Sequence, residues 1–77
     1  MVSRGNGSIS GGEALSTAEL RTLQYLQTHL TQQEIADRLH LTRHTVHTHA
    51  SAIYRKLGVS SRSDAVQAGL QHGLLES

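Results

Sequence analysis

Apolar residues recur at spacings of three and four between residues 15 and 75, which is the period of an amphipathic helix. Alternating β-branched and aromatic stretches, the mark of strands, do not occur. The pattern predicts an all-α fold of four helices. They run from about Thr17 to His29, from the Thr31 start signal to the turn at His40, over about 43–57, and from the Ser61 start signal to about His72. The apolar positions expected in the core are Leu20, Leu23, Leu26, Leu30, Ile35, Ala36, Leu39, Val46, Ala50, Ile53, Leu57, Val66 and Leu70.

Start and stop signals support these boundaries. Ser16 and Thr31 are each followed three residues later by a glutamate, the pattern of a capping box. Thr42 precedes the third helix as an N-cap, and Gly58 follows it with Arg55 and Lys56 in the last turn, where the helix dipole favours cations.

The chain has 77 residues and no cysteine, so we expect one small domain without disulfides or thiolate metal sites. Residues 1–12 are rich in Gly and Ser and have little to bury, which predicts a flexible leader, a linker from an upstream domain or a cloning remnant. The folded domain is expected over 13–77. No long apolar run predicts a membrane span or a signal peptide, which makes the cytoplasm the default location.

Charge is unevenly distributed, although the formal net charge is only +1. Five of the seven basic residues lie between Arg38 and Arg62, and no acidic residue lies between Asp37 and Asp64. The second and third helices would therefore form a hairpin whose second helix carries no negative charge. Such a helix–turn–helix can enter a DNA groove, which makes DNA binding the leading hypothesis.

A helical wheel separates the predicted third helix into two faces. An apolar stripe lies on one side, flanked by Arg43 and Lys56, and neutral-polar or basic residues lie opposite. Base edges need hydrogen-bond donors and acceptors, and phosphates need donors and positive charge, so this face suits both. The plainer interpretation is a solvated face without a partner. The outward residues are His44, His47, Thr48, Ser51 and Arg55.

From Leu15 to Leu75 the chain resembles the LuxR-type (GerE-type) DNA-binding domain of bacterial transcription regulators. The matching residues are Leu15-Ser16, Glu19, Glu34-Ile35-Ala36, Leu39, Thr45-Val46, His49, Ile53, Lys56-Leu57-Gly58, Arg62, Ala65 and Gly73-Leu74. Tyr25-Leu26 and the segment 53–56 are most similar to the domains at the C-termini of large ATPase-type regulators.

The resemblance implies sequence-specific binding of double-stranded DNA with the third helix in the major groove. It implies base contacts at His47, Thr48 and Ser51. Phosphate contacts are expected at Thr42, Arg43, Thr45, Lys56 and Arg62. Glu34 corresponds to a structural carboxylate that holds helices together.

The same resemblance implies a homodimer on DNA, with RNA polymerase as a candidate partner. The fourth helix often mediates the dimer in this family. Its small residues Ala65, Ala68 and Gly69 could allow close approach in a dimer or simply pack within the domain. Two departures stand out: the family usually has lysine at His47 and glycine near His29-Leu30.

Other chemistry is weakly supported. His44 and His47 are three apart and could chelate a metal, but no cysteine or carboxylate on that helix completes a site. Ser16, Thr31, Thr42 and Ser61 are better interpreted as caps than as nucleophiles, and His49 as a packed, hydrogen-bonded structural residue. We expect no enzyme activity, metal, cofactor or small-molecule ligand. The remaining alternative to DNA binding is a protein-interaction module that keeps the helix–turn–helix fold.

Overall fold

The computed structural model describes residues 14–76, which form four α-helices without strands. They are α1 (Thr17–Leu26), α2 (Gln32–Leu39), α3 (Arg43–Leu57) and α4 (Arg62–Gln71). The predicted all-α fold is confirmed, and α3 has the predicted bounds. The predicted leader, residues 1–12, lies outside the described residues. None of the helices in the described range is long and apolar enough to span a bilayer.

The predicted capping residues all lie where the sequence places them. The Ser16 hydroxyl accepts from the Glu19 amide at 3.1 Å while the Glu19 carboxylate accepts from the Ser16 amide at 2.8 Å. Thr31 and Glu34 repeat this reciprocal arrangement at α2, and Thr42 and Ser61 cap α3 and α4. Gly58 ends α3 in the left-handed conformation at φ +72°, as a C-terminal glycine does.

Helix α1 ends three residues earlier than predicted. No apolar residue lies between Leu26 and Leu30 to hold a further turn on the core. The Thr28 hydroxyl bonds back to the Tyr25 carbonyl and competes with helical pairing. The last carbonyls of α1 are instead satisfied from α4, as described below.

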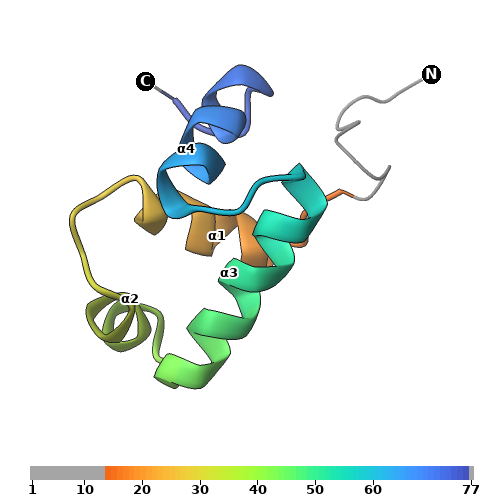
Figure 1. The fold of residues 1–77 in the computed structure, drawn as a ribbon. Coiled ribbons are helices and arrows are strands. Elements are labelled where there is room, and N and C mark those ends of the chain that lie inside the picture. The colour runs from red at the N-terminus through yellow and green to blue at the C-terminus, as the bar shows by residue number, and fades with distance from the viewer. Residues whose placement is uncertain (1–13, 77) are drawn as a thin grey trace.

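Helix α3 is the centre of the domain and contacts α1, α2 and α4 (Figure 1). Its predicted stripe is buried, with Val46 and Ile53 fully inaccessible. Leu23 of α1 and Ile35 of α2 are equally buried against it. Packing on three sides leaves only one side of α3 for solvent or a ligand.

The inward face of α4 differs from the prediction. Val66 and Leu70, expected in the core, are half-buried, whereas Ala65 and Gly69 are buried. A Cβ at Gly69 would lie 2.9 Å from Leu75 Cδ1 and 3.2 Å from Leu23 Cδ2, so the space beside α4 admits only small residues. Of the two roles considered for the small residues of α4, Ala65 and Gly69 therefore have the second, packing within the domain. Ala68 is half-buried.

Candidate nucleic-acid interface

The solvent side of α3 carries the three predicted base-contacting residues. His47, Thr48 and Ser51 are all exposed, on the face opposite the buried Val46 and Ala50. Arg43, His44 and Arg55 are exposed along the same helix. Since α3 contains no acidic residue, its solvent side presents donors, acceptors and positive charge together.

The Thr48 side chain is already oriented. Its hydroxyl donates to the His44 carbonyl at 3.0 Å, which leaves the oxygen lone pairs as acceptors. The ring nitrogens of His47 and the hydroxyl of Ser51 have no partner among residues 14–76. This patch is therefore a short row of side chains able to pair with groups of an incoming ligand.

The N-terminus of α3 is the second element of the site. Thr42 Oγ1 accepts from the Thr45 amide at 3.1 Å and lies 2.9 Å from Thr45 Oγ1, which fixes both hydroxyls at the helix start. Glutamate or aspartate occupies the first turn of α1, α2 and α4, but no acid occupies that of α3. No carboxylate of its own first turn therefore offsets the dipole at the start of α3, a setting suited to an anion.

Lys56, predicted at a phosphate, is engaged inside the domain. Its Nζ lies 2.8 Å from Glu19 Oε1, and the two side chains are only 15% and 10% exposed. Burial raises the pKa of Glu19, but the hydrogen bond from Lys56, the Ser16 amide and the Lys56 charge outweigh it, so the pKa of this carboxyl falls below its ordinary value. The ion pair joins the start of α1 to the end of α3.

Arg62, also predicted at a phosphate, caps α1. Its Nε donates to the Leu26 carbonyl at 2.9 Å, and its Nη2 donates to the Thr28 carbonyl at 2.9 Å and, more weakly, to that of Tyr25 at 3.4 Å. Because α1 has no basic residue in its last turn, Arg62 supplies the positive charge there from α4. Neither this role nor the Glu19 partner of Lys56 has a local signal in the sequence.

The role expected for Glu34 was wrong. Within the described chain, the hydrogen bonds of its exposed carboxylate stay at the start of α2, on Thr31. The backbone and then the hydroxyl of Thr31 lower the pKa of Glu34. The carboxylate that holds two helices together is Glu19.

The histidines form no metal site: residues 14–76 contain no group of three His, Cys, Asp or Glu side chains placed to hold an ion. His49 is half-buried beside Leu39 and Leu41, as a packed residue should be. The hydrogen bond expected for its ring is absent within the described range.

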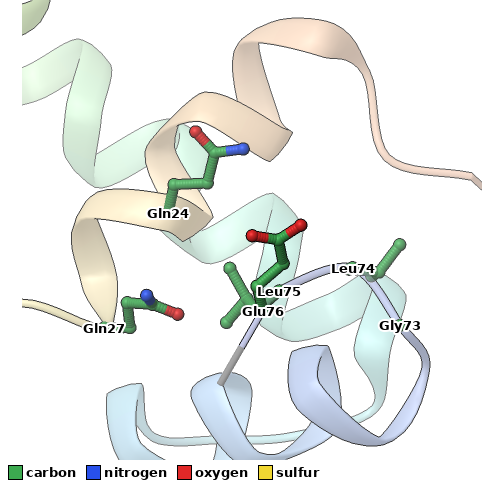
Figure 2. Close-up of a pocket in the computed structure, with 6 residues that line it drawn as sticks. All are labelled: Gln24, Gln27, Gly73, Leu74, Leu75 and Glu76. Carbon is green, nitrogen blue, oxygen red and sulfur yellow. The ribbon is translucent and has the colours of Figure 1, made fainter.

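A shallow depression lies away from α3, between α1 and the chain segment after α4. Figure 2 shows Gln24 and Gln27 on one side of it and residues 73–76 on the other. Two amides and one carboxylate are the polar side chains among its described lining residues. They do not form a nucleophile–base pair, so this depression supplies no recognisable catalytic group.

Comparison with known proteins identifies the family of this domain. The family model described as "Bacterial regulatory proteins, luxR family" matches residues 13–68. The chain belongs to the luxR family. It is thus a helix–turn–helix domain of the kind that binds DNA in transcription regulation, and α2 and α3 form the helix–turn–helix itself. The family is not a class of enzymes.

The luxR-family relatives ComA and VraR are longer than this chain. Transcriptional regulatory protein ComA of Bacillus subtilis is 36% identical over 63 residues, which are 82% of this chain and 29% of ComA. Response regulator protein VraR of Staphylococcus aureus is 39% identical over 64 residues, 83% of this chain and 31% of VraR. The chain thus spans less than a third of the length of either relative.

A solved structure shares the fold. The crystal structure of response regulator ChrA, from a heme-sensing two-component system, superimposes with a TM-score of 0.78 at 40% identity. The match covers 82% of this chain and 31% of ChrA. VraR and ChrA are response regulators, whereas the sequence segments around Tyr25 and Tyr54 pointed to ATPase-type regulators.

Proposed function

We propose that this luxR-family domain binds double-stranded DNA sequence-specifically, with α3 in the major groove. The observation that carries the proposal is the solvent side of α3, where His47, Thr48 and Ser51 are exposed on a helix without a carboxylate. Imidazole and hydroxyl groups both donate and accept hydrogen bonds, which suits direct readout of base edges.

Phosphate contacts are proposed at the start of α3. Thr42 and Thr45 hold their hydroxyls together there, and the exposed Arg43 adds a positive charge at the same end of the helix. Such a cluster fixes the register of a helix on DNA without reading sequence. Lys56 and Arg62 have internal partners instead.

We propose a homodimer on DNA that uses the outer side of α4. Val66 and Leu70 are one helical turn apart and half-buried in the isolated domain, whereas Ala68 lies on the other flank of the buried Ala65 and Gly69. Pairing the Val66 and Leu70 side chains across a two-fold axis would bury their exposed apolar surface, and two α3 helices would then meet half-sites about one DNA turn apart. RNA polymerase remains a predicted partner, and an upstream regulatory domain, as in a response regulator, is a further expectation.

A selection from a random DNA pool tests the function. The 77-residue chain should enrich a short sequence, and its affinity for that duplex should fall steeply with salt. Ser51→Ala or Thr48→Ala should change the preferred sequence, whereas Arg43→Ala should weaken all sequences alike. If no duplex is bound even at low salt, DNA binding is ruled out and the protein-interaction module becomes the better hypothesis.

A further inference from the structure

We infer that Glu19 and Lys56 form a positioning pair that sets α3 against α1, and that Lys56 does not neutralise a DNA phosphate. This inference rests on the proposed DNA binding by α3. It assigns one of the two cations in the last turn of α3 to the inside of the domain.

The geometry uses most of the hydrogen-bonding capacity at the pair. Glu19 Oε1 accepts from the Ser16 amide and from Lys56 Nζ, both at 2.8 Å. Lys56 Nζ also lies 3.5 Å from the Ala14 carbonyl oxygen, so the ammonium is surrounded by acceptors from the chain around the start of α1. A cation held this way is directed toward α1.

Electrostatics argue against a phosphate at Lys56. The ammonium and the carboxylate cancel, so a polyanion approaching the pair meets little net charge. Moving Lys56 to a phosphate would also leave Glu19, a side chain only 10% exposed, without its counter-charge. A buried carboxylate that loses its partner is strongly unfavourable.

The pair ties the last turn of α3 to the start of α1, at the end of the helix opposite to the proposed phosphate contacts. Val46 and Ile53 pack the middle of α3 on the core, so the pair adds a second, separate point of attachment. His47 lies nine residues from Lys56, roughly 13 Å along the helix at the usual rise. A tilt of about 5° pivoting at the pair would therefore move His47 by roughly 1 Å, enough to spoil a base contact.

The test measures binding of the selected duplex by the full 77-residue chain over a range of salt concentrations. Lys56→Met should weaken binding roughly tenfold and leave the slope of log affinity against log salt unchanged, because no phosphate contact is lost. Glu19→Gln alone should weaken binding by a similar factor with the slope unchanged, because it breaks the same pair while glutamine still completes the capping box. The double variant should bind about as weakly as either single variant, because both single changes remove one interaction.

Arg43→Met is the matched control, because this exposed cation is proposed at a phosphate. Its slope should fall by about 0.9, the change expected for one lost contact, and its loss of affinity should add to that of Glu19→Gln. If Lys56→Met alone fails to fold, the salt slope of the Glu19→Gln/Lys56→Met double variant is compared with that of the wild type. An equal slope again shows that no phosphate contact is lost with Lys56. A fall in slope for the Lys56 variants, or losses that simply add in the double variant, would overturn the inference. Failure of DNA binding itself would differ, because the wild type would then bind no duplex.

Discussion

Arg62 offers the sharpest test of how the domain is held together. The substitution Arg62→Met removes the guanidinium but keeps most of the apolar stem, so it isolates the capping of α1. Two hydrogen bonds of 2.9 Å and one of 3.4 Å would be lost. A hydrogen bond to a charged group contributes about 1.5–3 kcal/mol when well formed.

The expected loss is smaller than the sum of three such bonds. Arg62 is half-buried, and water can reach the Thr28 carbonyl once the guanidinium is gone. We therefore expect the free energy of unfolding to fall by about 2 kcal/mol, a large part of the stability of a domain this small. At roughly 4–8 °C per kcal/mol, the melting temperature should drop by about 8–16 °C.

Urea unfolding of the 77-residue chain, followed by far-ultraviolet circular dichroism, measures this loss. Arg62→Lys should recover only part of it, because an ammonium cannot span the carbonyls that a planar guanidinium reaches. Arg21→Met is the matched control, since Arg21 is an exposed arginine and its loss should change stability by less than about 0.5 kcal/mol. If Arg62→Met behaves like this control, the reasoning is refuted, and Arg62 is available for the phosphate contact that the sequence predicted.

Three further predictions concern pH, packing and affinity. The pKa of Glu19 is lowered in the folded state, so its contribution to stability is fully present above the ordinary carboxyl pKa and is lost as pH falls through the folded-state pKa. Glu19→Gln should therefore make the urea midpoint decline less steeply below about pH 5. An unchanged decline would contradict this prediction. Gly69→Leu should lower the free energy of unfolding by about 2 kcal/mol, because even a Cβ there meets Leu75. An unchanged melting temperature would show that Leu75 moves aside without an energetic cost. His47→Lys should tighten binding of the selected duplex at pH 7.5 by about fivefold, roughly 1 kcal/mol, because lysine adds a permanent positive charge beside the DNA. An unchanged affinity in a fluorescence anisotropy titration would place His47 away from the DNA.

Features set by neighbouring residues could be predicted from the sequence. The N-caps of all four helices and the Gly58 stop depend on residues at most a few positions apart. The exposed face of α3 follows from the apolar stripe opposite it. These local rules, with the family resemblance, were sufficient for the fold class and for the placement of His47.

Features set by distant residues could not be predicted. The partners of Lys56 and Arg62 lie 37 and 36 residues away, on α1, so both cations looked free in the sequence. The inward face of α4 depends on the space that Leu23 and Leu75 leave beside Gly69, which favours small residues over the larger Val66 and Leu70. Glu19 and Glu34 have the same capping-box pattern, and only tertiary packing brings a lysine to one of them.

The central claim is that the solvent side of α3 reads DNA. Backbone amide chemical shifts of the ¹⁵N-labelled chain, measured with and without a duplex carrying one half-site, test it most directly, because one half-site recruits no second copy to α4. The largest changes are predicted over residues 42–51, with small changes around Val66 and Leu70. Changes centred on α4, or no changes at low salt, would contradict the claim.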